Sequence, residues 1–196
     1  MATLLYQGHA SIRIKTSEGK VIYIDPFAGE GYDLEADMVL ITHEHYDHNA
    51  VDRVKLTPRT IIIRSKDALI DGKYNYFRYF GVFIQSVPAC NKNHKVDECV
   101  GYLLEIEGKK IYVAGDTDYV PYMEKLGEME IDYAFLPIDG IYNMGPQEAT
   151  RCANIIKPKN LIPYHMKPGM LFDIKMDMQV SYPGSMLVRP GDEITL

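Results

Sequence analysis

The sequence contains no tryptophan, only three cysteines and no long uninterrupted run of apolar residues. Its longest apolar runs are a handful of residues, which excludes a helix that spans a bilayer. The cysteines, Cys90, Cys99 and Cys152, are odd in number and form no C-x-x-C pair, so we expect reduced thiols in a cytoplasmic protein. Nothing near them in the sequence supports a thiolate metal site or a nucleophile.

An excess of positive charge is also missing. The formal net charge is −6, which argues against a surface that binds nucleic acid or an anionic membrane. The N-terminus has no basic segment followed by a long apolar stretch, so no secretory signal is expected. The 196 residues, 46% of them hydrophobic and 24% charged, suit one globular domain that covers residues 1–196.

Short apolar or alternating runs predict a strand-rich fold. The expected strands lie at 11–15, 21–27, 38–42 and 60–64, at two positions within 100–114 on either side of a turn at 107–110, and at 133–137 and 160–164. Helical spacing and a proline in the first turn predict helices at 146–157 and 121–127, the second with Asp118 as its cap. Segments 48–56 and 65–71 suit short helices, and the aromatic stretch 74–80 suits core or an interface. We therefore expect an α/β domain with sheets inside and helices outside.

Histidine is scarce but clustered. Only six are present, and three of them stand with an aspartate in the segment T-H-E-H-Y-D-H-N directly after the buried strand at 38–42. These residues, His43, His45, Asp47 and His48, carry the usual non-thiol ligands of zinc and related divalent ions. A solvated polar loop is the alternative. A single tetrahedral ion could not take all four neighbours, whereas a strand-to-helix turn can direct the first two at one ion and the last two at a second.

Such a site needs ligands from elsewhere in the chain, and three residues stand at suitable places. Asp116 ends a strand after Gly115, His165 ends the strand at 160–164, and His94 lies in a loop just before the strand at 100. Ligand sites gather at strand ends on one edge of a layered α/β fold. These residues therefore complete the predicted metal centre.

Four other residues are candidates for supporting roles. Asp25 closes the strand at 21–24 and could accept the N–H of a ligand histidine, although a turn aspartate before Pro26 is an equal alternative. His9 could line the pocket, or could be structural. Tyr142 and Asn143 lie on a loop between a strand and a helix, a place suited to contact with substrate.

Together these motifs resemble the metallo-β-lactamase superfamily, whose signature His-x-His-x-Asp-His is matched at positions 43–48. More narrowly, the chain is similar to the branch of small metal-dependent hydrolases related to L-ascorbate-6-phosphate lactonase. That likeness runs from about residue 5 to residue 165, through segments 8–11, 25–27, 91–94, 101–106, 111–118 and 136–144. One departure is the stretch D-G-I-Y-N-M at 139–144, where relatives typically have G-G-x-Y-T-M.

The resemblance implies a four-layer αββα sandwich with a two-metal site at one edge. It implies that one ion binds His43, His45 and His94, that the other binds Asp47, His48 and His165, and that Asp116 bridges them. Zinc suits this set best, and manganese or iron fits the same ligands. Two such ions share a water and present hydroxide as nucleophile, while Asp47 could handle the proton as a catalytic residue.

These implications lead to one expected function and two alternatives. We expect a two-metal hydrolase of a small ester, lactone or phosphoester, such as an anionic sugar derivative. A phosphodiesterase or nuclease of the same superfamily is one alternative, which the acidic balance disfavours. A non-catalytic metal-binding protein that kept the fold is the other. The expected partner is a small-molecule substrate, and assembly into a homo-oligomer stays open.

Overall fold

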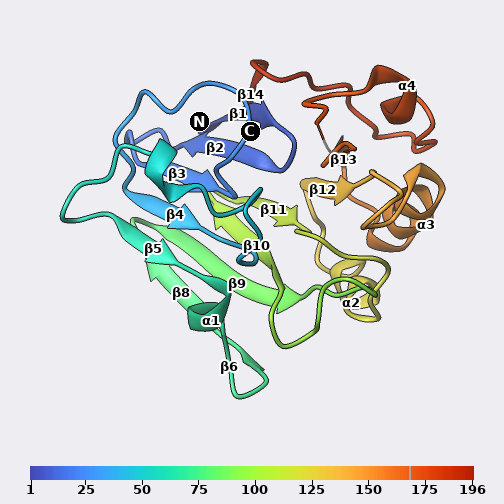
Figure 1. The fold of residues 1–196 in the computed structure, drawn as a ribbon, viewed down its shortest axis with the longest axis horizontal. Helices are drawn as coiled ribbons and strands as arrows, with labels where there is room; N and C mark the ends of the chain where they lie inside the picture. Colours follow the sequence, from blue (N-terminus) through green and yellow to red (C-terminus); the bar gives the residue numbers. More distant parts are fainter. Residues whose placement is uncertain (168) are drawn as a thin grey trace.

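Two six-stranded β-sheets form the centre of the fold (Figure 1), which a computed structural model describes for residues 1–167 and 169–196. The first sheet has the order β14-β1-β2-β3-β4-β5. Its strands are β1 (Thr3–Gly8), β2 (Ser11–Lys15), β3 (Val21–Ile24), β4 (Met38–Leu40), β5 (Ile61–Ile63) and β14 (Glu193–Thr195). Because β14 pairs with β1, with Thr195 opposite Thr3, the two ends of the chain lie side by side.

The second sheet has the order β13-β12-β11-β10-β9-β8. Its strands are β8 (Tyr76–Tyr79), β9 (Val82–Pro88), β10 (Val100–Ile106), β11 (Lys109–Val113), β12 (Tyr133–Pro137) and β13 (Asn160–Tyr164). A small hairpin of β6 (Leu69–Ile70) and β7 (Lys73–Tyr74) forms a separate two-stranded sheet that packs against the main core.

The main core lies between the two sheets. Fully buried side chains of the first sheet, such as Tyr6 and Ile12, belong to one apolar cluster with Tyr102, Leu104 and Ile111 of the second. Burying one aliphatic or aromatic side chain of this size contributes roughly 1.5–3 kcal/mol. The alternation of apolar residues along β2 and β10 therefore fixes which face of each strand turns inward.

Helices cover the outer face of the second sheet (Figure 1). They are α2 (Tyr122–Leu126) and α3 (Pro146–Ile156), with α4 (Ile174–Asp177) nearby. Helix α3 begins with a proline and buries Ala149, Cys152, Ala153 and Ile156 against the sheet, as its spacing predicted. The outer face of the first sheet has a thinner cover, because Tyr32, Leu34 and the short 3₁₀ helix η1 (Val51–Arg53) pack there instead of a long helix.

The mixed α/β class and the expected strands are confirmed, and the helices are shorter than predicted. Segment 48–56 forms only the 3₁₀ helix η1, and the helix in 65–71 is α1 (Ser65–Ala68), which gives way to β6. The prediction that Asp118 caps the helix at 121–127 is wrong. The residue at the N-cap of α2 is Pro121, without a side-chain hydrogen bond, and the backbone N–H of Asp118 donates instead to the carbonyl of Cys90.

Parallel pairing decides where the functional side chains gather. In the first sheet, β3, β4 and β5 run parallel, and in the second, β11, β12 and β13 do. The carboxyl ends of parallel strands meet at the same edge of a sheet, where polar side chains that follow each strand come together. No helix of the described residues is both long and apolar enough to cross a membrane.

Candidate metal centre

The loops that follow these parallel strands carry the predicted ligands. Asp25 follows β3, and the histidine-rich segment 43–48 follows β4. From the second sheet, Asp116, Asp139 and His165 follow β11, β12 and β13 in turn. The predicted ligands, which are up to 122 positions apart in the sequence, therefore meet at one edge between the two sheets.

Three turns at the site, one of them after β1, place a non-glycine residue in the left-handed backbone region. His9, Asp25 and His165 have φ values of 52°, 46° and 53°, and each is the first residue after a strand. Aspartate and histidine tolerate this region better than most residues, but it still costs of order 1–3 kcal/mol. The reversal of the chain directly at the strand end turns these side chains toward the site.

One glycine, Gly115, allows two segments of the site to approach each other closely. Gly115 has φ of 67°, and a Cβ atom there would lie 3.0 Å from the Cβ of Thr42 and 3.0 Å from the carbonyl oxygen of Val100. No side chain fits at this position without displacing both neighbours. The close approach brings the next residue, Asp116, against the loop that follows β4.

The first group of candidate ligands is His43, His45 and His94, whose nitrogen atoms all lie within 4.8 Å of one another. The Nε2 of His94 lies 3.1 Å from the Nδ1 of His45. On its other side, His94 Nδ1 lies 2.9 Å from Oδ1 of Asn91, which can only accept, so Nδ1 carries the hydrogen and the Nε2 lone pair faces inward. Burial, with the charge of His48, lowers the pKa of His43 to about 2, so this ring is in its neutral, ligating form.

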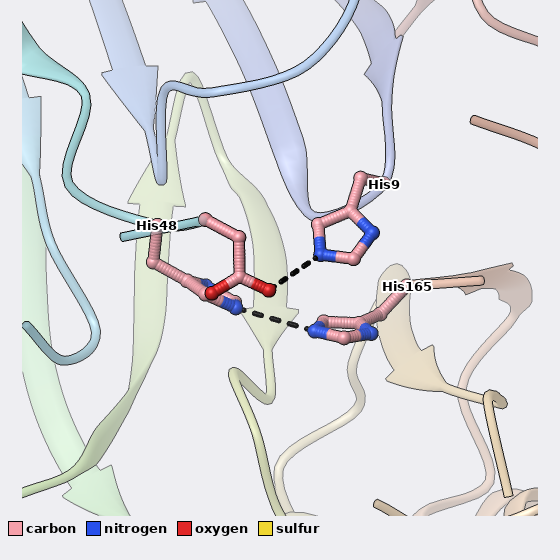
Figure 2. A group of neighbouring side chains, drawn as sticks. His9, His48 and His165 are labelled. Atoms are coloured by element: carbon pink, nitrogen blue, oxygen red, sulfur yellow. Dashed lines mark hydrogen bonds and ion pairs between the residues drawn. The ribbon is translucent and has the colours of Figure 1, made fainter. Parts of the chain in front are cut away.

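The second group contains Asp47, His48 and His165 together with His9, also within 4.8 Å. Figure 2 shows the three rings converging from separate loops. The Nε2 atoms of His48 and His165 are 3.2 Å apart, and Nε2 of His9 lies 3.1 Å from Oδ2 of Asp47. This is the second set predicted from the sequence, with His9 added.

Asp116 lies between the two groups. Its Oδ1 is 3.2 Å from Nε2 of His48 and 3.0 Å from Nε2 of His165. Its Oδ2 is 3.2 Å from Nε2 of His94 and 3.9 Å from Nε2 of His43. Burial opposes ionisation, but the charges of His165 and His48 hold the pKa of Asp116 well below its usual value. One carboxylate oxygen therefore faces each group.

Several of these atoms lack the hydrogen-bond partners that burial demands. Nε2 of His43 and Oδ1 of Asp116 are buried without one among the described residues, because the His48 and His165 nitrogens near Oδ1 make no aligned hydrogen bond to it. Buried polar atoms are nearly always paired, and a cation in each group would give each of these atoms a partner. Imidazole nitrogen and carboxylate oxygen without thiolate are also a suitable donor set for zinc and similar divalent ions. The residues present therefore fit a metal centre.

Asp25 lies behind the second group and is fully buried. It accepts hydrogen bonds from the backbone N–H of Thr42 at 2.8 Å, from Oγ1 of Thr42 at 2.7 Å and from Nδ1 of His48 at 2.8 Å. Burial disfavours the charged form of His48, but the carboxylates of Asp116 and Asp25 raise its pKa well above the usual value. The bond at Nδ1 turns Nε2 toward the centre.

A cavity of about 520 Å³ opens onto the two groups. Its lining residues are Glu44, His45, Tyr46, Asp47, Asn93, His94, Asp116, Tyr142 and His165. Of the residues predicted to contact substrate, only Tyr142 is among them. His9 is buried beside Asp47, and the amide of Asn143 is hydrogen-bonded to Asp139 at 2.7 Å and to Asn91 at 2.8 Å.

Sequence reasoning missed two residues that support this centre. Oδ2 of Asp139 lies 3.4 Å from Nδ1 of His165, and Asn91 holds His94. A signal existed for both, because Asp139 directly follows a strand, as Asp116 nearly does, and Asn91 stands three positions before a candidate ligand. Neither signal was specific enough to assign a role.

Comparison with known proteins agrees with this geometry. The family model described as the beta-lactamase superfamily domain matches residues 3–165. A metal-dependent hydrolase of Thermococcus onnurineus is 36% identical, with 84% of each chain covered, and one of Thermus thermophilus is 30% identical, also with 84% of each covered.

Solved structures show the same fold. The crystal structure of a protein described as a metal-dependent hydrolase from Parabacteroides distasonis has a TM-score of 0.81 at 28% identity, covering 97% of this chain and 94% of that one. A metallo hydrolase from Ignicoccus hospitalis has a TM-score of 0.77 at 22% identity, covering 98% and 97%, and shows the likeness of fold alone. The narrower resemblance to L-ascorbate-6-phosphate lactonase stays a prediction. The chain belongs to the metallo-β-lactamase superfamily and is a metal-dependent hydrolase.

Proposed function

We propose that this protein hydrolyses a small ester, lactone or phosphoester at a centre of two divalent cations, within a single domain of residues 1–196. The placement of Asp116 between two groups of imidazoles, with one carboxylate oxygen toward each, carries the proposal. One cation would be held by His43, His45 and His94 and the other by Asp47, His48 and His165, with Asp116 shared. Zinc is the expected metal, and manganese or iron fits the same donors.

When bound, two such cations would lower the pKa of a water molecule toward neutrality and act as Lewis acids on the substrate's carbonyl or phosphoryl oxygen. The chain's own contribution is orientation. Asp25 and Asn91 accept the Nδ1 hydrogens of His48 and His94, so the Nε2 atoms of both rings face the centre. Partners of this kind typically change metal affinity or activity by about 10–100-fold when removed.

Asp47 would hold a cation and accept a proton. Burial opposes its charge, but the hydrogen bond from His9 and the charge of His48 lower its pKa below the usual value, so this carboxyl is ionised at neutral pH. The hydrogen bond from His9 to Oδ2 fixes the orientation of this carboxylate beside His48 and His165. An Asp47→Asn variant should bind metal more weakly and lose turnover. If this variant kept both metals and full turnover, Asp47 would have no part in proton transfer.

The test begins with elemental analysis of the full chain purified without added metal, for which the proposal requires about two equivalents of transition metal. Turnover is then measured on lactones, aryl esters, bis-p-nitrophenyl phosphate and single-stranded RNA, each with and without EDTA. Hydrolysis of lactones or esters that EDTA abolishes supports the proposal. Activity restricted to the diester or RNA would instead identify a phosphodiesterase or nuclease.

A matched pair of variants ties turnover to the centre. Asp116→Asn should lower both metal content and turnover, whereas Asp52→Asn, at an exposed position of η1, should change neither. Full metal content without turnover of any substrate class would favour a protein that kept the fold without catalysis.

A further inference from the structure

We propose that this site takes substrates whose group beyond the scissile bond is uncharged and apolar, and that the rings of Tyr46 and Tyr142 contact that group. The inference rests on the proposed function, since it concerns the substrate class of the same centre. It departs from the anionic sugar derivative considered above, and it follows from what lines the cavity of about 520 Å³.

The charges that line the cavity are negative. Besides the candidate ligands, its described lining consists of Glu44, Asn93 and the two tyrosines, and includes no lysine or arginine. Arg64 donates from Nη1 to both oxygens of Glu44, at 3.0 and 2.8 Å, but does not itself line the cavity. A carboxylate or phosphate remote from the reacting bond would therefore lose its hydration without gaining a cationic partner.

Lysine side chains do occur beyond Tyr142, but carboxylate side chains accompany them. A neighbouring cavity of about 510 Å³, which shares Tyr142, is lined by Lys92 and Lys167 together with Asp118 and Glu148. The opposite charges there leave no surplus of positive charge to attract an anion. An anionic group that extended past Tyr142 would thus gain little.

The ring of Tyr46 is exposed, and contact with Phe27 holds it in place. The residue is 74% exposed, although it follows a candidate ligand in the loop after β4. Its ring meets Phe27 edge to face, with centroids 5.7 Å apart, and Phe27 in turn meets the buried ring of His9 at 5.8 Å. A tyrosine held in this way presents apolar area at the cavity with little loss of side-chain freedom on binding.

Tyr142 is also held by its backbone and free at its side chain. Its N–H donates to Oδ1 of Asp139 at 2.7 Å, and its carbonyl accepts from Nδ2 of Asn93 at 2.9 Å. The residue is nevertheless 48% exposed. Small-molecule sites combine apolar and aromatic walls with few polar groups, and the two tyrosines supply such walls beside the candidate ligands.

The experiment uses two esters with the same leaving group and chain length. 4-Nitrophenyl butyrate ends in a methyl group, and mono-4-nitrophenyl succinate ends in a carboxylate. Because that carboxylate attacks its own ester and releases the phenolate without enzyme, the spontaneous rate of each ester is measured and subtracted. With the metal-loaded full chain, we expect kcat/KM to be about tenfold or more higher for the butyrate, since the carboxylate of the succinate would lose hydration without gaining a cationic partner. Equal or faster hydrolysis of the succinate would overturn the inference and leave the proposed hydrolase function standing.

A binding measurement tests the same point without turnover. Butyrohydroxamate and succinic monohydroxamate share a metal-chelating head and differ only in the tail. Titrated into the metal-loaded chain, the butyrate analogue should bind about tenfold more tightly. Tighter binding of the carboxylate tail, or no binding of either compound, would contradict the inference, whereas a chain that takes up no metal would contradict the proposed function instead.

Variants assign the effect to the two rings. Tyr142→Ala and Tyr46→Ala should each raise KM for the butyrate about three- to tenfold, while Tyr→Phe at either position should retain the wild-type KM because the ring is kept. Tyr76→Ala is the matched control, since Tyr76 is 72% exposed on β8 and does not line this cavity. Unchanged KM in both alanine variants would exclude the tyrosines as contacts.

Discussion

Nε2 of His9 lies 3.1 Å from Oδ2 of Asp47. Its neighbours hold His9 in place. The backbone N–H of His9 donates to the carbonyl of Leu171, and its carbonyl accepts from the backbone N–H of His165 and the hydroxyl of Tyr6. The centroids of the His9 and His165 rings are 4.0 Å apart. Burial lowers the pKa of His9, and a carboxylate only accepts, so a neutral His9 donates from Nε2. This contact sets the orientation of a candidate ligand.

His9→Ala should therefore weaken metal binding at the second group about 10–100-fold. His9→Gln, whose amide can donate at a similar reach, should recover part of the loss. Competition with a chelator of known affinity measures both metal equivalents in one titration. The equivalent at His43, His45 and His94 serves as the internal control, and equal weakening of both equivalents would contradict a role confined to Asp47.

Asp25→Asn should weaken metal binding, because Asp25 orients the candidate ligand His48. The aspartate accepts three hydrogen bonds, and an amide would turn a donor toward one of the three donors. We expect metal affinity to fall about 10–100-fold and the free energy of unfolding to fall by about 1–3 kcal/mol.

Asp37→Asn is the control for that variant. Asp37 also accepts from a backbone N–H, that of Val21, and from Lys20, but it lies away from the centre. Denaturant unfolding and metal titration should show that this change affects stability alone. Loss of metal affinity in both variants would mean that general destabilisation explains the effect of Asp25.

Removal of metal should lower thermal stability as well as activity. A cation that binds only the folded chain stabilises it by about 4 kcal/mol at a free concentration of 1,000 times Kd, and each kcal/mol shifts Tm by about 2–4 °C in a chain of this size. Calorimetry before and after EDTA, and after re-addition of zinc, manganese or iron, measures the shift. An unchanged Tm on removal of bound metal would argue against ligands buried in the fold.

Asp177 in α4 should make stability depend on pH. It is buried, its Oδ2 has no hydrogen-bond partner among the described residues, and burial raises its pKa from 3.8 to about 6. Between these two values the folded chain binds more protons than the unfolded chain, so its contribution to stability falls as the pH rises from about 4 to about 6 and is constant above.

Asp177→Asn should remove that slope and raise Tm at pH 8, where the wild-type carboxyl is charged. Asp52→Asn, at an exposed position, should leave both the slope and Tm unchanged. Thermal unfolding between pH 4 and pH 8 makes the comparison. A lower Tm for Asp177→Asn at pH 8 would mean that the charge at this position is stabilised by a partner.

The predictable strands were those with continuous apolar runs, such as β4, β12 and β13. Two of the strands that were not predicted, β8 and β14, lack that signal. In β8, three of the four residues are exposed or nearly so, as on an edge strand, and β14 has three residues that pair only with β1, at the far end of the chain. Such pairing depends on tertiary contacts that no local pattern records.

The residues of the candidate site also fall into those that a sequence pattern predicts and those that it does not. His43, His45, Asp47 and His48 were legible because their spacing is local, and His94, Asp116 and His165 because each stands near a strand end. The roles of Asp139 and Asn91 could not be predicted. Asp139 contacts His165 of another loop, at a distance that the packing of the second sheet sets, whereas Asn91 contacts His94 through a tight turn of its own loop.

The strand order has one more consequence, for the way the chain holds together. Candidate ligands on the loop after β4 belong to the first sheet, whereas those at the ends of β9, β11 and β13 belong to the second. Cations bound between them would tie positions far apart in a chain whose cysteines are free. Because a site assembled from both sheets does not exist in the unfolded chain, the free energy of metal binding would add to the free energy of folding. The centre would then link the first sheet to the second, as a disulfide links two parts of a secreted domain, but reversibly.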